Sequence, residues 1–367
     1  MRNIKNIHKL LFIIVVISII SIVYYHKKRI TEGFTSSHVE PKECNSMNNL
    51  YNKLNPSIGS IQPSNPNFKY NLNDYYIQTA YNACSIGEYK NSYVSTCALI
   101  NVLKTGVRGL DFEIYSIDNE PVVATSTDDN YNIKETYNYV PFSEVLNLIV
   151  NYAFSGGTVP NPKDPIIIHL RFKSSNIPMY ENFARLFKSF DKYFMGPKYS
   201  YENHGKNFGK VPLVDLMGKI IVIVDKSNNT FTDVPDFDEY VNMTSNSIFM
   251  RALPYYDVKN TPDLDELIEY NKQNMTIVMP NNGSNPGNPS SMVCREMGCQ
   301  LVAMVYQNND VNLEENMEYF NKAGTSFVLK PNNLRYEPVY IPAPKKQDPK
   351  LSFQRREVKS QYYNFNI

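Results

Sequence analysis

Short runs of apolar, mostly β-branched residues recur between residues 69 and 331, and they constrain the fold more than any other feature. The runs are YYIQTA, GLDFEIY, PVVAT, PIIIHLRF, GKIIVIVD, TIVM, QLVAMVY and TSFVLKP. Segments of helical periodicity lie between several of them, at residues 93–105, 142–153 and 178–193. Continuous Ile/Val runs joined by helical crossovers are typical of parallel strands buried on both faces. About eight strands over roughly 260 residues predict an α/β fold, a TIM (β/α)8 barrel, and a doubly wound open sheet is the alternative.

Composition supports a folded domain and limits its partners. The 367 residues carry a net charge of +1, and 42% of them are hydrophobic. That hydrophobic fraction is large enough for a sizeable core, whereas the near-neutral charge gives no electrostatic reason to bind nucleic acid. We therefore expect no nucleic-acid partner.

The cysteine pattern argues against a zinc site. The chain has five cysteines, namely Cys44, Cys84, Cys97, Cys294 and Cys299. No two of them have CxxC spacing, and the chain has only five histidines to complete a metal site. The odd number argues against a complete disulfide framework. Because unpaired cysteines tend to be buried, we expect small buried thiols.

An apolar run near the N-terminus, LLFIIVVISIISIVYY at residues 10–25, predicts a membrane anchor. It is slightly shorter than the roughly 20 residues that span a bilayer, but the tyrosines at its end and the basic residues at 26–29 suit the membrane interface. A cleaved signal peptide is the alternative, and it is disfavoured because no small-x-small cleavage site follows the run. We predict an uncleaved single-pass helix over residues 1–26. Its orientation stays open because basic residues flank both ends.

Two polar segments flank the predicted barrel. Residues 27–68 are rich in Ser, Asn and Pro and show no sustained periodicity, which predicts a polar linker. Residues 332–367 form a basic tail, for which we expect solvated disorder. Contact of the tail with anionic phospholipid is the alternative, worth about 1 kcal/mol for each Lys or Arg near the membrane surface.

The carboxyl ends of barrel strands are where chemistry gathers, and here they carry a recognisable succession of motifs. The successive ends read YYIQTAYNACSIG, GVRGLDFEIY, NEPVVATS and DPIIIHLRF. This order resembles the X region of phosphoinositide-specific phospholipase C. The later segments DLMGKIIVIVDK, LIEYNKQNMTIVMP, GCQLVAMVYQ and YFNKAGTSFVLKPNNLR resemble the close of the X region and the Y region. The resemblance implies a phospholipase C-like phosphodiesterase barrel over residues 69–331, with an X-like half at 69–226 and a Y-like half at 264–331.

The resemblance implies a reaction that this chain lacks the groups to perform. Members of the family cleave the glycerol–phosphate ester of a phosphoinositide with two histidines. The motifs place the first histidine at Tyr81 and the second at Thr125. A phenol titrates near pH 10 and a threonine hydroxyl not at all in the working range. Since each general acid or base typically contributes about 10²–10⁴-fold, loss of both predicts little remaining chemistry.

The resemblance also implies a calcium site with one incompatible ligand. The family holds calcium with an asparagine and three carboxylates. These positions fall at Asn82, Asp111, Glu113 and Arg171, so the fourth ligand has become a cation. We therefore expect no calcium in this chain and expect Arg171 to pair with Asp111 and Glu113, as the bacterial branch uses an arginine in place of calcium. A phosphate-binding role for Arg171 is the alternative.

His169 lies two residues before Arg171, so in a strand both side chains share one face. A hydrogen-bonded core histidine one layer deeper in the barrel is favoured over a relocated catalytic group.

These observations lead to one leading hypothesis and two rivals. The leading one is a membrane-anchored, phosphatidylinositol-specific phospholipase C-like pseudoenzyme that serves as a lipid or protein interaction module. The first rival is an active phosphoric diester hydrolase that cleaves phosphoinositides with a rebuilt site. The second binds anionic lipid without cleavage, through Arg171 and the basic tail.

Overall fold

The computed structural model describes residues 15–19, 21, 42–54, 56–338, 342–348, 351 and 355–366. Two compact units result, one ending at Tyr336 and the other running from Glu337 to Ile367. The predicted anchor at residues 1–26 lies outside the described residues, except for positions 15–19 and 21. Within the described part of the chain, no helix is both long and apolar enough to cross a membrane.

The first unit is built on eight parallel strands arranged in a ring in chain order. They are β1 Tyr75–Ala80, β2 Gly109–Ile117, β5 Ile166–Phe172, β6 Ile220–Asp225, β7 Met243–Ser245, β8 Met250–Pro254, β9 Met275–Met279 and β10 Leu301–Met304. Hydrogen-bonded ladders join neighbouring strands everywhere except between β7 and β8, so within the described residues the ring is nearly closed. The predicted parallel barrel is confirmed in this form, and the open sheet is not the fold.

Two of the eight predicted strands lie outside the ring. β3, Glu120–Ala124, follows β2 through a turn at Asp118 and Asn119, whose φ values of 52° and 65° favour a tight hairpin. It therefore runs antiparallel to β2 and pairs in turn with β4, Val140–Pro141. β11, Phe327–Leu329, pairs antiparallel with the first half of β1. The ring instead includes β7 and β8, whose sequences MTS and MRALP lack the Ile/Val runs that marked the other strands.

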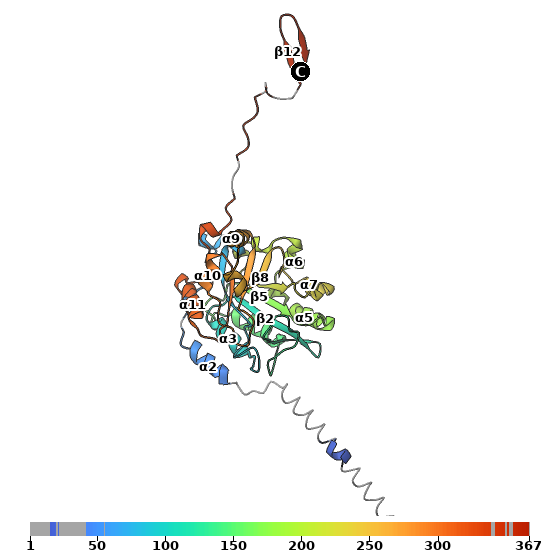
Figure 1. The fold of residues 1–367 in the computed structure, drawn as a ribbon, viewed down its shortest axis with the longest axis vertical. Coiled ribbons are helices and arrows are strands. Elements are labelled where there is room, and N and C mark those ends of the chain that lie inside the picture. The colour runs from blue at the N-terminus through green and yellow to red at the C-terminus, as the bar shows by residue number, and fades with distance from the viewer. Residues whose placement is uncertain are drawn as a thin grey trace, which may run out of the picture. The chain divides into compact units, whose positions relative to one another are not determined.

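Helices cover the outside of the ring (Figure 1). The three predicted helical segments are confirmed as α3 Thr96–Lys104, α4 Phe142–Leu148 with a π-helical continuation at Ile149–Ala153, and α5 Ile177–Ser189. The others are α6 Ser200–Gly205, α7 Pro235–Asp238, α8 Tyr255–Lys259, α9 Leu264–Gln273, α10 Ser291–Glu296 and α11 Val311–Ala323. Polar caps set several starts: the Asp310 side chain accepts from the backbone N–H groups of Asn312 and Leu313 at the start of α11.

The strands divide the core into an inner and an outer layer. Along β5 and β6, Ile167 and Ile223 belong to the apolar cluster that fills the ring, whereas Ile168 and Val222 belong to the outer cluster, which also contains helix residues such as Phe183. This alternation follows from the period of two in a strand. At the carboxyl ends of β2 and β5, the inward positions are polar and charged instead. That break in the apolar interior marks the candidate site.

Part of the predicted linker is folded onto the barrel. Residues 42–51 form helix α2, Lys42–Tyr51, and the Tyr51 hydroxyl donates to the backbone oxygen of Tyr306 at 2.5 Å. Ile58 and Ile61 are buried as well. The linker prediction missed this packing because the few apolar residues of the segment are widely spaced. Each of these side chains packs on the barrel separately, so they form no continuous apolar stripe in the sequence.

The cysteines are not all free thiols, in contrast to the expectation. Cys44 of α2 and Cys97 of α3 form a disulfide with a Cα–Cα distance of 6.3 Å. Cys84, Cys294 and Cys299 are free and buried, as expected. Sequence spacing missed the pair because the two cysteines are 53 residues apart and meet only through the packing of α2 on α3.

The second unit, within the predicted basic tail, contains a hairpin rather than only irregular chain. Its strands are β12, Glu357–Lys359, and β13, Asn364–Asn366, and Val358 lies opposite Phe365. The turn is held by Ser360, whose side chain accepts from the backbone N–H groups of Tyr362 and Tyr363.

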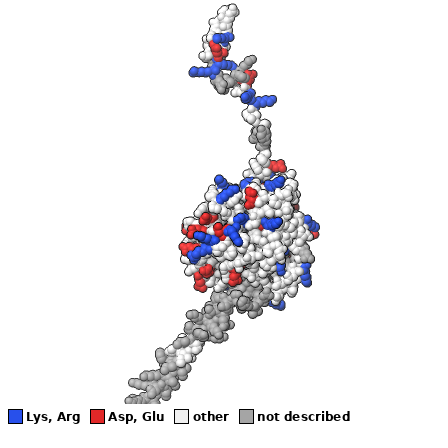
Figure 2. Space-filling model, turned by 180° about the vertical axis from the view of Figure 1, so that it is seen from behind, with Lys and Arg blue, Asp and Glu red and all other residues white. Residues whose placement is uncertain are grey.

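On the face of the first unit seen in Figure 2, Lys and Arg are interspersed with Asp and Glu.

We expect the Cys44–Cys97 disulfide to stabilise the attachment of α2. The double variant Cys44→Ser/Cys97→Ser removes both sulfurs without leaving a reactive thiol. Because the disulfide closes a loop of 53 residues, its loss should lower the free energy of unfolding by about 2–4 kcal/mol. Urea unfolding of the full-length chain measures this difference.

The natural chain treated with reductant is the matched control. It should fall to the stability of the variant, whereas the variant should not respond to reductant. Equal stability of the oxidised natural chain and the variant would contradict the expectation.

Candidate functional site

The ends of three neighbouring strands bring the residues predicted from sequence into one cluster. β2 and β5 pair in parallel, with Asp111 opposite His169 and Glu113 opposite Arg171. Asn82 follows β1 with a φ of 42°, a left-handed conformation that asparagine tolerates better than most residues. All five side chains are buried. The cluster therefore lies at the carboxyl-terminal mouth of the barrel.

Arg171 occupies the centre of this cluster. Its Nε and Nη2 donate to the two oxygens of Asp111 at 3.0 and 2.7 Å, which is a bidentate pair. Nη2 also donates to Asn82 Oδ1 at 3.1 Å. Nη1 lies 3.3 Å from Glu113 Oε1 and also contacts Asp129 Oδ1. The pairing of Arg171 with Asp111 and Glu113 that we expected is confirmed.

The electrostatic effect of this arrangement is visible in two pKa values. Burial by itself would raise the pKa of the Asp111 carboxyl, but the Arg171 charge and the hydrogen bond from His169 outweigh burial and hold that pKa well below its usual range. Burial alone would lower the pKa of Arg171, whereas Asp111 and the other surrounding groups raise it well above the ordinary value. The two groups thus stabilise each other's charged forms.

Glu113 is held by neutral donors in addition to Arg171. It accepts hydrogen bonds from Asn82 Nδ2 at 3.0 Å and from the Tyr115 hydroxyl at 2.8 Å. The backbone N–H and the hydroxyl of Ser126 also donate to it, at 2.9 and 3.1 Å. Its acceptor capacity is therefore used within the protein.

The residues that the sequence motifs predict to stand at the family's calcium positions, as they are arranged here, do not fit a calcium ion. Calcium takes six to eight oxygen ligands, roughly 2.3–2.6 Å away. Here the oxygens of Asn82 and Asp111 point at the guanidinium of Arg171, and those of Glu113 at hydrogen-bond donors. In the described part of the chain, no group of three or more His, Cys, Asp or Glu side chains is arranged to hold a metal ion.

Tyr81 and Thr125, which the sequence motifs predict to stand at the family's histidine positions, are packed rather than presented to solvent. The ring of Tyr81 lies 4.7 Å from the Arg171 Cζ and meets the edge of Tyr89 at 5.5 Å between ring centroids. Burial raises the pKa of the Tyr81 phenol well above its ordinary value. The Thr125 hydroxyl donates to the backbone oxygen of Tyr89 at 3.1 Å. Both side chains are therefore buried and held by contacts within the protein.

His169 is a hydrogen-bonded core residue, as the sequence favoured. Nδ1 lies 2.7 Å from Asp111 Oδ1, and Nε2 lies 2.8 Å from the Ser245 hydroxyl. The order of groups is that of a Ser-His-Asp triad. However, Ser245 is fully buried, so no substrate atom reaches its oxygen in this arrangement. Sequence reasoning missed Ser245 because the strand that it ends, β7, was itself not recognised.

Two further residues of the site were missed, Asp129 and Lys173. Asp129 belongs to the loop after β3, and Lys173 Nζ donates to its backbone oxygen at 2.6 Å. Lys173 lies two residues beyond Arg171 and so shares its strand face, a signal that could have revealed it. Asp129 had no such signal, because a loop residue reaches the mouth only through the path of the folded chain.

Family comparisons agree with this geometry. Residues 68–226 match the X domain, and residues 227–333 the Y domain, of phosphatidylinositol-specific phospholipase C. This chain belongs to the phosphatidylinositol-specific phospholipase C family. None of the curated proteins compared with it matches its sequence.

Solved structures with the same fold include the phospholipases PLC21 of S. officinalis and L. pealei. Each is 18% identical to this family member, with a TM-score of 0.57 over 73% of the chain. The chain spans only 38% of the length of either. A calcium-dependent phosphoinositol-specific phospholipase C from a Pseudomonas species matches 75% of the chain and all of its own at 11% identity, with a TM-score of 0.44.

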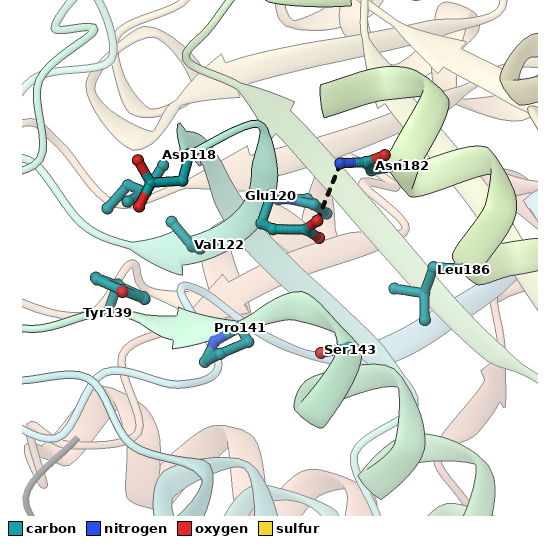
Figure 3. Close-up of a pocket in the computed structure, with 10 residues that line it drawn as sticks. Asp118, Glu120, Val122, Tyr139, Pro141, Ser143, Asn182 and Leu186 are labelled. Carbon is teal, nitrogen blue, oxygen red and sulfur yellow. Dashed lines mark hydrogen bonds between the residues drawn. The ribbon is translucent and has the colours of Figure 1, made fainter. Parts of the chain in front are cut away.

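A separate pocket of about 400 Å³ lies beside the β2–β3 hairpin, away from the cluster (Figure 3). Its walls come from the hairpin, β4 and the helices α4 and α5, and Glu120 at its rim accepts from Asn182 Nδ2 at 3.0 Å. Its lining includes none of the residues at the family's catalytic or calcium positions. The pocket is therefore separate from the cluster around Arg171 in this phospholipase C family member.

We expect Arg171→Met to be strongly destabilising. The change leaves Asp111 and Glu113 as buried carboxylates without their cation, which should lower the free energy of unfolding by about 3–5 kcal/mol. Adding Asp111→Asn should recover part of the loss, because it removes one of the unpaired charges. Chemical unfolding of the four chains in a double-mutant cycle measures the coupling.

Arg251→Met is the matched control. Arg251 makes a bidentate pair with Glu266, but both side chains are partly exposed, so its loss should cost at most about 1 kcal/mol.

The pH dependence of the free energy of unfolding is a second check. Because the pKa of Asp111 is lower in the folded state, its contribution is complete above about pH 4 and is lost as the pH falls further. Asp111→Asn should flatten this acid dependence; an unchanged acid profile would contradict the assignment.

Proposed function

We propose that this family member is a membrane-anchored pseudoenzyme that does not cleave phosphoinositides and serves as a lipid or protein interaction module. The observation that carries the proposal is the position of the Arg171 guanidinium among Asn82, Asp111 and Glu113. At about 4 Å, two unit charges interact by roughly 4 kcal/mol at an effective dielectric constant of 20. A cation in this position repels a divalent ion by a similar or larger amount.

The proton-transfer groups support the same proposal. Phosphodiester cleavage needs a base for the attacking hydroxyl and an acid for the leaving oxygen. The family positions for these tasks hold Tyr81 and Thr125, and both side chains are buried within hydrogen-bonded or aromatic packing. Loss of two such groups typically costs several orders of magnitude in rate.

Phosphoinositide hydrolysis by the full-length protein is the direct test. Vesicles containing phosphatidylinositol or its bisphosphate, with and without calcium, should yield no inositol phosphate above the protein-free background. Calcium-dependent release that Asp111→Asn abolishes would overturn the proposal. Arg171→Glu is a second test, because it places a carboxylate where the family's fourth calcium ligand is expected. The melting temperature of this variant should rise with added calcium, whereas that of the natural chain should not change.

The rival function is an active phosphodiesterase with a rebuilt site. It is favoured by one observation, the Ser245–His169–Asp111 hydrogen-bond chain. In the hydrolysis assay, turnover that disappears in His169→Ala would support this rival. Turnover that survives in both His169→Ala and Asp111→Asn would depend on neither residue and would contradict this rival.

Membrane association is the second part of the proposal. It is supported by the apolar run at residues 10–25 and by the basic tail, in which residues 337–367 carry six Lys or Arg and three Asp or Glu. The residues concerned are Lys345, Lys346, Lys350, Arg355, Arg356 and Lys359, against Glu337, Asp348 and Glu357. An anionic membrane attracts such a segment by about 1 kcal/mol for each basic residue near the surface.

We expect the tail to be protected by anionic lipid. When the full-length chain is reconstituted in vesicles, trypsin should cut residues 345–359 several-fold more slowly with phosphatidylinositol than with phosphatidylcholine alone. High salt should remove the difference, because it screens the charges. Phosphatidylserine at equal charge separates a general charge effect from headgroup recognition. Cleavage rates that ignore lipid composition would contradict this role of the tail.

A further inference from the structure

The disulfide between α2 and α3 bears on the compartment in which the barrel folds. Cys44 and Cys97 are both buried, and their bond closes the packing contact between the two helices. Disulfides form and persist in oxidising compartments, such as the lumen of the endoplasmic reticulum and the cell exterior. Those of the cytosol are usually transient and belong to catalytic or redox-sensing sites. A buried, structural disulfide therefore favours an oxidising compartment.

The same compartment is where asparagine side chains receive N-linked glycans, and the sequence offers four acceptor triplets. An acceptor is Asn-x-Ser or Asn-x-Thr, with any residue except proline in the middle. The four triplets begin at Asn228, Asn242, Asn274 and Asn282. An asparagine-rich chain contains such triplets by chance, so the folded structure has to distinguish among them. The sugar is joined to the amide nitrogen Nδ2, and a usable acceptor in the folded protein presents that amide to solvent.

Three of the four asparagines have their amide groups engaged within the barrel. Only 1% of Asn242 is exposed, and its Nδ2 donates to a backbone oxygen at 3.1 Å. The half-buried Asn228 likewise donates from Nδ2 to a backbone oxygen at 3.0 Å. Asn274, also half-buried, accepts from Asn207 Nδ2 at 3.0 Å. A glycan on Asn242 is incompatible with this fold, and one on either of the others would disturb a hydrogen bond.

Asn282 is the member of the set whose side chain is exposed. It lies in the loop that follows β9, and the chain on both sides of it is fastened to other parts of the barrel. Asn281 Oδ1 accepts from the backbone N–H of Tyr256 at 2.8 Å, and the backbone N–H of Gly283 donates to the backbone oxygen of Thr127 at 2.8 Å. The fold therefore holds this one acceptor triplet at the surface.

We propose that Asn282 is an N-glycosylation site and that the barrel lies on the lumenal or extracellular side of its membrane. The co-reactant is a lipid-linked oligosaccharide pyrophosphate. In the transfer, a bond forms between Asn282 Nδ2 and C1 of the first sugar, the bond from C1 to the pyrophosphate oxygen breaks, and Nδ2 gives up one proton. The disulfide and the exposed triplet are independent observations that require the same compartment.

This placement has two consequences beyond the modification itself. It orients the helix predicted at residues 10–25, whose flanking charges left both directions open, with residues 1–9 on the cytoplasmic side. It also puts a bulky, hydrophilic group at the rim of the barrel mouth. The backbone oxygen of Ser284 accepts from the backbone N–H of Tyr89, whose ring packs on Tyr81 beside Arg171. A glycan on Asn282 would hinder a flat bilayer from approaching this rim.

Synthesis of the full-length chain in the presence of endoplasmic reticulum microsomes tests both parts. The mass of the product should rise by one core oligosaccharide, and endoglycosidase treatment should reverse the rise. Asn282→Gln and Ser284→Ala should each abolish it, because each destroys the triplet. Asn285→Gln is the matched control: Asn285 is exposed in the same loop but precedes a proline, so the glycan should remain.

Two further readouts separate the site from the placement. Added protease should spare the barrel until detergent opens the microsomes, and alkylation of the denatured, unreduced product should modify three of the five cysteines. A mass increase that persists in Asn282→Gln, or a protected barrel without a glycan, would overturn the site. Digestion of the barrel in sealed microsomes, or alkylation of all five cysteines, would overturn the placement.

Discussion

Two carboxylates point from β2 into the barrel, and a single buried guanidinium allows them to remain charged there. An uncompensated charge in such a position costs several kcal/mol, so the geometry of Asp111 and Glu113 depends on Arg171. The parallel ladder of β2 and β5 places both oxygens of Asp111 against the planar guanidinium of Arg171. Asn82, Tyr81 and Asp129 are in turn arranged around the same group. The barrel mouth is organised by this ion pair.

The same strand register would present the same positions to a metal ion if position 171 were acidic. A barrel fixes where side chains at strand ends point, and it does not decide their chemistry. Here the side chains at these strand ends are the hydrogen-bond and ion-pair partners of a guanidinium. The aromatic pair Tyr81 and Tyr89 packs beside Arg171. Backbone hydrogen bonds join the loops that follow β1, β3 and β9 to one another.

The sequence predicted much of the fold because hydrophobic periodicity is a local property. Six of the eight ring strands carry Ile, Val or Leu runs long enough to recognise, whereas MTS and MRALP do not. PVVAT has the composition of a buried strand, but a two-residue turn before it forces an antiparallel hairpin instead of a ring position. The pairing of Arg171 with Asp111 was also predictable, since neighbouring parallel strands bring equivalent ends together. Asp129, Ser245 and the Cys44–Cys97 pair were not, because each depends on where a distant segment crosses the barrel.

The sequence by itself determined the class of fold and the family. These features are encoded in short stretches whose residues are neighbours in the chain. Only the tertiary structure decided that the guanidinium of Arg171 lies between Asn82, Asp111 and Glu113, that Asp129 contacts it, and that His169 joins Asp111 to Ser245. The physical reason is that such contacts join residues 42 to 89 positions apart, and their distances follow from strand register and loop path. No local pattern of side chains contains that information.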